Sequence, residues 1–162
     1  MHPAALGQLL LLLGVANGAP VVAKKLFGRV GMWPLDGGAR FADGRPVLGP
    51  SKTWRGVLAS LAATSAAAPL VGLSPGIGAV VGATAMAGDL LSSFLKRRLG
   101  RVSSSRATGL DQIPEALFPL LACRAALALS AADIAAGVVL FFVGEVVLSR
   151  LFYRLGLRDR PY

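Results

Sequence analysis

Runs of apolar residues long enough to cross a lipid bilayer dominate this sequence and restrict its fold more than any other feature. A helix needs roughly 20 apolar residues to cross about 30 Å of hydrocarbon. Five runs approach that length, at about 4–23, 56–73, 76–95, 114–132 and 134–151. Only 15% of the residues are charged, against about 25% in soluble domains. We therefore predict one all-α polytopic membrane domain over 1–162, with about five transmembrane helices.

The basic residues predict how these helices are oriented. Of the 17 Lys and Arg residues, seven lie in 24–55, five in 96–106 and four in 150–160. With five spans these segments share one side of the membrane, which the positive-inside rule identifies as the cytoplasm. We expect a multi-pass cell-membrane protein with its N-terminus outside, its C-terminus in the cytoplasm, and its chemistry in the cytoplasmic loops 24–55 and 96–113. The net charge of +9 then indicates anionic lipid or phosphate partners rather than nucleic acid.

Several features inside the spans predict packing. Ser74-Pro75 predicts a tight hairpin between the second and third spans, and the spacing of Gly78 and Gly82 allows close helix approach. Arg124 and Glu145 are expected near mid-membrane, where they pair or where Arg124 holds a lipid phosphate. Asn17, followed by Gly18, Ala19 and Pro20, predicts a break that lines a cavity in the first span. A plain proline kink is the alternative.

The third span ends in a row of polar side chains on one helical face. Asp89, Ser92, Ser93 and Lys96 stand at i, i+3, i+4 and i+7. Asp89 lies roughly 10 Å inside the cytoplasmic boundary, where an unpaired carboxylate costs several kcal/mol. An ion pair with Lys96 or Arg97 would explain it, but acids inside a membrane are functional by default, so we favour a metal or ion ligand.

The first cytoplasmic loop combines turn-forming and basic residues. Asp36-Gly37 and Asp43-Gly44 predict turns. A short basic and hydroxyl-bearing segment precedes the second span, where helix N–H groups favour an anion such as phosphate; it contains Lys52, Thr53 and Arg55. Because Pro50 and Ser51 separate Gly49 from Lys52, this segment is not a Walker loop.

Two acids, Asp111 and Glu115, stand immediately before the fourth span. Acids suit a helix N-terminus, so a capping role is one interpretation. The other is a metal-phosphate site, because hard oxygen ligands from separate elements, Asp89 and Asp111, lie among many cations.

Taken together, several ordered segments resemble the CDP-archaeol synthase family, the archaeal-type branch of the CTP-dependent phosphatidate cytidylyltransferases. They are NGAP in the first span, PLDGG, DGRPVLGPSKTWRG, GDLLSSFLKRR and GLDQIPE, and they cover about 17–115. The sequence departs from the broader family at Arg55, where an acid is usual. Of the last acidic cluster, Gly109-Leu110-Asp111 is recognisable.

The resemblance implies a site and a reaction. A phosphate oxygen of a membrane lipid monophosphate, 2,3-bis-O-geranylgeranyl-glycerol phosphate or phosphatidic acid, would attack the α-phosphorus of CTP and release pyrophosphate. Asp89 and Asp111 would hold Mg²⁺, with Lys52, Thr53, Lys96 and Arg97 around the CTP phosphates. Asn17, Asp36, Arg55, Ser92 and Ser93 complete the expected substrate-binding set. The partners are thus CTP and a lipid phosphate, and a homo-oligomer stays an open alternative.

Two other functions compete with this interpretation. Asp36-Gly37-Gly38-Ala39-Arg40 resembles the start of a CDP-alcohol phosphotransferase motif, but one residue is missing and the downstream acids that would complete its metal site are absent. A non-enzymatic small membrane protein or transporter would use Asp89, Arg124 and Glu145 as packing or transport charges. Five spans without an internal repeat speak against a transporter.

Overall fold

The computed structural model of the protein describes residues 2–105 and 107–154, the last seven without their side chains. Three of the basic residues used in the orientation argument, Arg106, Arg158 and Arg160, lie outside these residues. The described residues form α1 (Pro3–Phe27), α2 (Trp54–Ala67), η1 (Ala68–Val71), α3 (Pro75–Arg98), α4 (Gln112–Ala122) and α5 (Ala131–Arg154). Outside these helices the described residues form turns and two isolated β-bridges, and no β-strand. The all-α fold class is confirmed.

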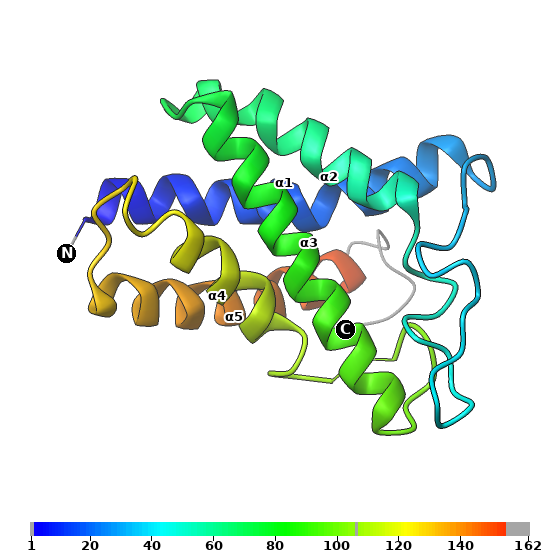
Figure 1. Ribbon diagram of the computed structural model, residues 1–162. Helices are drawn as coiled ribbons and strands as arrows, with labels where there is room; N and C mark the ends of the chain where they lie inside the picture. Colours follow the sequence, from blue (N-terminus) through cyan, green and yellow to red (C-terminus); the bar gives the residue numbers. More distant parts are fainter. Residues whose placement is uncertain (1, 106, 155–162) are drawn as a thin grey trace.

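Successive helices run in alternating directions, so the two long connections meet at one end of the bundle (Figure 1). Loop 1, residues 28–53, joins α1 to α2, and loop 2, residues 99–111, joins α3 to α4. The N-terminus lies at the opposite end (Figure 1). This arrangement brings the motifs of loop 1 close to the end of α3.

One apolar core joins the helices. Leu9, Leu12 and Leu13 of α1 are fully buried, together with Val81 of α3 and Leu120 of α4. Within the described residues, α1 and α3 are long and apolar enough by themselves to cross a membrane. These two helices correspond to the first and third predicted spans, although α1 continues four residues further, to Phe27.

The second and fourth predicted spans are shorter as helices than expected. With a rise of about 1.5 Å per residue, the 14 residues of α2 and the 11 residues of α4 cover roughly 21 and 16 Å. The prediction that the fourth span continues as a helix to residue 132 was wrong. The helix α4 ends at Ala122, and turns follow it. Ala128 takes a positive φ of 51°, and Ser130 Oγ accepts the Asp133 N–H at 3.1 Å, which caps a new helix, α5.

The predicted break in α1 is also wrong. The helix runs unbroken from Pro3 to Phe27 with Pro20 inside it. Proline removes one backbone hydrogen bond from a helix interior, and packing against neighbouring helices tolerates that loss. Asn17 does not open the helix either, since its Nδ2 donates to Leu13 O one turn earlier at 3.2 Å.

The hairpin between α2 and α3 packs as the sequence predicts. Ser74 caps α3 by accepting the Ile77 N–H at 3.3 Å. A Cβ added at Gly78 would lie 2.3 Å from Thr64 O, and one added at Gly82 would lie 2.4 Å from Thr64 Oγ1. The absence of side chains at these two positions lets α2 pack closely against the glycine face of α3.

Arg124 and Glu145 do not form the expected pair. Arg124 is exposed in the turn after α4, and its carbonyl accepts the Leu129 N–H at 2.9 Å near the start of α5. Glu145 lies 14 residues beyond the first residue of α5, roughly 21 Å along the helix. The early end of α4 therefore leaves Arg124 near the start of α5, whereas Glu145 lies past the middle of that helix.

Candidate active site where the loops meet α3

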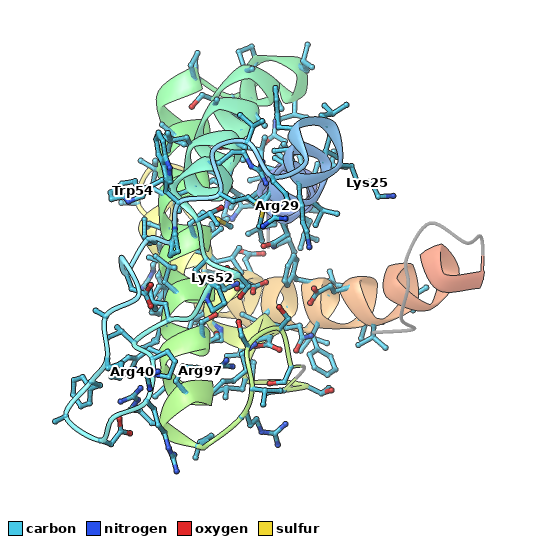
Figure 2. The ribbon with its side chains drawn as sticks, turned by 90° about the vertical axis from the view of Figure 1, so that its right-hand side faces the viewer. Lys25, Arg29, Arg40, Lys52, Trp54 and Arg97 are labelled. Carbon is cyan, nitrogen blue, oxygen red and sulfur yellow. The ribbon has the colours of Figure 1, made fainter. Side chains whose placement is uncertain are left out.

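Lys52 of loop 1 reaches Asp89 of α3. Its Nζ lies 2.5 Å from Asp89 Oδ2, and the two side chains are 21% and 19% exposed. Figure 2 views this end of the molecule and shows Lys52 near its middle beside α3, whereas Lys25 and Trp54 point outward on opposite sides. The expected partners of Asp89 on its own helix, Lys96 and Arg97, are replaced by a cation from a separate loop.

Glu115 joins this pair from the first turn of α4. It is 6% exposed, and its carboxyl group lies close enough to that of Asp89 for the two groups to interact electrostatically. Gly88 makes this approach possible, because a Cβ there would lie 2.3 Å from Pro114 O and 2.7 Å from Glu115 N. The predicted site residues did not include Glu115. The sequence signal was the pair Gly88-Asp89, a residue without a side chain placed directly before the acid.

Lys96 connects α3 to loop 2. Its Nζ lies 2.7 Å from Asp111 Oδ1 and donates to Ser105 O at 3.0 Å, while Asp111 Oδ2 accepts the Ala107 N–H at 2.9 Å. Ser92, one turn earlier, donates to Leu110 O at 2.7 Å. Asp89 on α3 and Asp111 at the end of loop 2 are thus each paired with a different lysine.

Arg97 lies under the junction of the two loops. It is 4% exposed, and its Nη2 donates to Val102 O at 2.6 Å. Its buried Nε has no hydrogen-bond partner among the described residues. Ser51 Oγ and Ser103 Oγ lie 3.0 Å apart above it, and Gly49, with φ +96°, leaves room for that contact. A buried guanidinium with an unused donor is suited to an anion.

Three of the expected substrate-binding residues hold the backbone of this region. Asp36 Oδ2 accepts the N–H groups of Leu48 and Gly49, both at 2.9 Å. Burial raises the pKa of Asp36, but the hydrogen bonds from these backbone N–H groups and from that of Gly38 outweigh it and lower the pKa. Thr53 Oγ1 accepts the Gly56 N–H at 3.2 Å and caps α2. Arg55 Nη1 donates to Gly28 O at 3.0 Å, at the end of α1.

The remaining expected residues fall into two places. Ser93 is buried at 3% exposure on the same part of α3 as Ser92. Asn17, in contrast, is occupied with its own helix. Their predicted contacts with substrate stay predictions, as do those of Asp36 and Arg55.

The carboxylates permit Mg²⁺ but do not enclose it. Within residues 2–105 and 107–154, no group of three or more His, Cys, Asp or Glu side chains is placed to hold a metal. Mg²⁺ is usually bound by one or two carboxylates together with substrate phosphates, so a complete protein cage is not required. Asp89 and Glu115 place hard oxygen donors close together, which fits binding of Mg²⁺ by two carboxylates and the phosphates of a substrate.

Comparison with known proteins identifies the family. A family model described as CarS-like, CDP-archaeol synthase, matches residues 74–162. The CDP-archaeol synthase of Hyperthermus butylicus is 46% identical over 120 residues, which cover 68% of this chain and 67% of the relative. The chain belongs to the CDP-archaeol synthase family.

Two further proteins are similar to this chain over most of its length. The CDP-archaeol synthase of Aeropyrum pernix is 36% identical over 161 residues, which cover 91% of this chain and 86% of the relative. A solved structure of an intramembrane enzyme for the biosynthesis of archaeal membrane lipids superposes with a TM-score of 0.73 at 34% identity, covering 87% of this chain and 90% of the other. With its apolar helices α1 and α3, this family member is a membrane protein.

Proposed function

We propose that this protein transfers CMP from CTP to a membrane lipid monophosphate and yields a CDP-lipid and pyrophosphate. One observation carries the proposal: Lys52 of loop 1 meets Asp89 of α3 at the end of the bundle where Lys96 and Arg97 are also buried. A site for a nucleoside triphosphate and its metal requires cations for the phosphates and carboxylates for the metal. Membership of the family supports an enzyme over the transporter alternative.

The reaction needs charge neutralisation more than acid–base chemistry. A lipid phosphate monoester is largely ionised at neutral pH, so its oxygen can attack the α-phosphorus of CTP without a general base. The bond from the α-phosphorus to the bridging oxygen breaks, and pyrophosphate leaves with the electron pair. Lys52, Lys96 and Arg97 bind and orient the phosphates and stabilise the charge that develops on pyrophosphate.

Mg²⁺ is the cofactor that we propose for this site. Asp89 would hold it, with Asp111 or Glu115 as the second carboxylate. When bound, the ion would neutralise phosphate charge during the transfer. The proximity of the Glu115 and Asp89 carboxyl groups favours Glu115 as the second ligand, whereas Asp111 is paired with Lys96. The apparent Mg²⁺ affinities of Asp111→Asn and Glu115→Gln separate the two assignments. The variant that lacks the second ligand should bind Mg²⁺ more weakly, and the other should bind it as wild type does.

We further propose that α1 to α5 form a multi-pass arrangement with loops 1 and 2 on the cytoplasmic side. CTP then reaches the site from water, and the lipid arrives sideways with its phosphate at the interface. In a Cys123→Ala background, Ser51→Cys in loop 1 should react with a membrane-impermeant maleimide only from the cytoplasmic side. Ser130→Cys, before α5, should react only from outside. Labelling of both from the same side would contradict the topology.

The activity is tested by pyrophosphate release from purified, detergent-solubilised protein. The protein is supplied with CTP and Mg²⁺ and with geranylgeranyl ether glycerol phosphate, diacyl phosphatidic acid or no lipid. We expect release that depends on both CTP and lipid, and the preferred lipid assigns the ether or ester branch. Lys52→Ala should have a strongly reduced kcat/KM, whereas Lys24→Ala removes an exposed lysine from α1 and serves as the matched control.

A folded protein that releases no pyrophosphate with either lipid would refute the proposed reaction. Binding of CTP to the same sample would then indicate a different acceptor. Absence of both binding and release would return the non-enzymatic alternative.

A further inference from the structure

A hairpin in loop 1, residues 40–46, folds onto the C-terminal end of α3, and Arg98 makes the contact. Its Nη1 donates to Asp43 Oδ1 at 2.6 Å, and its Nη2 donates to Pro46 O at 2.5 Å. The guanidinium group is planar and its donors point in fixed directions. Two bonds from different nitrogens therefore fix both the distance and the orientation of the hairpin relative to α3.

Two aromatic rings hold the same guanidinium group. Arg98 Cζ lies 4.7 Å from the ring centroid of Phe41, in the hairpin, and 5.0 Å from that of Phe94, on α3. The two rings meet edge to face with their centroids 5.5 Å apart. Both distances to Arg98 are within the range of about 6 Å for a cation–π interaction. The aromatic contacts add to the hydrogen bonds and join the hairpin to α3 a second time.

Arg45 makes the reciprocal contact from the hairpin. Its Nη1 donates to Arg98 O at 2.7 Å, which satisfies a backbone carbonyl at the end of α3. Its guanidinium covers Gly100, where an added Cβ would lie 3.4 Å from Arg45 Nη1. The hairpin is thus also a cap for the helix that carries Asp89, Lys96 and Arg97.

The chain runs from this hairpin directly to Lys52. Asp36 holds the backbone of Leu48 and Gly49, and the Lys52 N–H donates to Gly49 O at 3.2 Å. The segment between hairpin and lysine has little freedom as a result. Loop 1 is attached to α3 at two points, through Arg98 at one and through the Lys52 and Asp89 side chains at the other.

We propose that Arg98 is a positioning residue for the CTP-phosphate site. It fixes loop 1 on α3, so that Lys52 is held at a constant separation from Asp89 and Arg97, which α3 itself carries. Asp89 stands nine residues before Arg98, about 13.5 Å along the helix axis, so Arg98 acts through loop 1 and not by contact with the Lys52 and Asp89 pair. The assignment rests on the function proposed above.

The test combines Arg98→Ala with Lys52→Ala. Displacing a binding group by about 1 Å can cost roughly 100-fold in rate, and we expect kcat/KM for CTP to fall about 10- to 100-fold in Arg98→Ala, mostly through KM. In a Lys52→Ala background the same substitution should have little further effect, because the group that it positions is already gone. Arg98→Lys should recover only part of the loss, since one ammonium group cannot reproduce both hydrogen bonds and the stacking.

Limited trypsin digestion provides a readout that does not depend on activity. Cleavage within the hairpin at the bond between Arg40 and Phe41 should be faster in Arg98→Ala and in Asp43→Ala than in wild type. Asp43 has a side chain that is 39% exposed, so its replacement tests the same contact with little risk to folding. Arg29→Ala is the control, because it removes an exposed arginine from loop 1 outside the hairpin.

Two results would overturn the proposal. The first is a folded Arg98→Ala protein, or Asp43→Ala where Arg98→Ala does not fold, with kcat/KM within about twofold of wild type. The second is a double variant in which the losses from Arg98→Ala and Lys52→Ala multiply, as independent sites do. A wild-type protein without CTP-dependent release would refute the proposed function instead, and the digestion would still show whether Arg98 holds loop 1.

Discussion

Replacing Gly88 with alanine should separate α4 from α3 and damage the site without changing any charged group. The new Cβ would lie 2.3 Å from Pro114 O, 2.5 Å from Pro114 C and 2.7 Å from Glu115 N. All three are backbone atoms, which cannot turn away as a side chain can. Because comfortable contacts of this kind need about 3.5 Å, the first turn of α4 must move by roughly 1 Å.

The effect on stability follows from two opposing contributions. Alanine in place of glycine stabilises a helix interior by about 1 kcal/mol, whereas overpacking costs about 1–3 kcal/mol. The free energy of unfolding should therefore fall by no more than about 2 kcal/mol. Activity should fall much further, by about 100-fold, because the displaced turn carries Glu115 away from Asp89.

The assay is kcat/KM for pyrophosphate release, measured together with thermal unfolding in the same detergent. Gly14→Ala is the matched control, since it also lies within a helix and its added Cβ meets no atom within 4 Å. We expect the control to keep its activity and to gain slightly in stability. A Gly88→Ala protein with wild-type activity would show that the close approach of α4 to α3 is not needed for the reaction.

Three other substitutions test separate parts of the site. Asp89→Ala should abolish Mg²⁺-dependent turnover and leave a folded, extractable protein; full activity would remove Asp89 from the metal site. Lys96→Ala should raise KM for CTP, since it removes a buried cation, and an unchanged CTP affinity would leave its contacts with loop 2 as its only role. Asp36 has a lowered pKa, so its support of loop 1 is present above the unfolded pKa of about 3.9 and is lost as pH falls through the folded value. Hydrogen exchange at Leu48 and Gly49 should accelerate in that acidic range in wild type, whereas Asp36→Asn should show no such step.

Local properties of the sequence were enough to predict the helical class, α1 and α3, and the turn at Ser74-Pro75. Each depends on the residues of its own segment: a long apolar run, or a cap followed by proline. The glycine face of α3 was predictable for the same reason, because a residue without a side chain at every fourth position marks a close contact wherever the partner comes from.

The extent of the fourth helix was not predictable from hydropathy. An apolar turn and an apolar helix have the same composition, and the residues 123–130 that leave the helix are almost as apolar as those of α4. Pro20 led to the opposite error, because it predicted a break in a helix that is in fact continuous. Its lost hydrogen bond did not end α1, because neighbouring helices hold the segment in place.

Which charges meet was decided by the tertiary structure alone. The sequence placed Asp89, Lys96 and Arg97 on one helix and Lys52 in a distant loop, but an ion pair needs its atoms within about 4 Å. That distance depends on how loop 1 folds back over α3 and how closely α4 can approach Gly88. Residue types and spacing therefore determined which chemistry the chain carries, whereas the packing of separate segments decided which groups share a site.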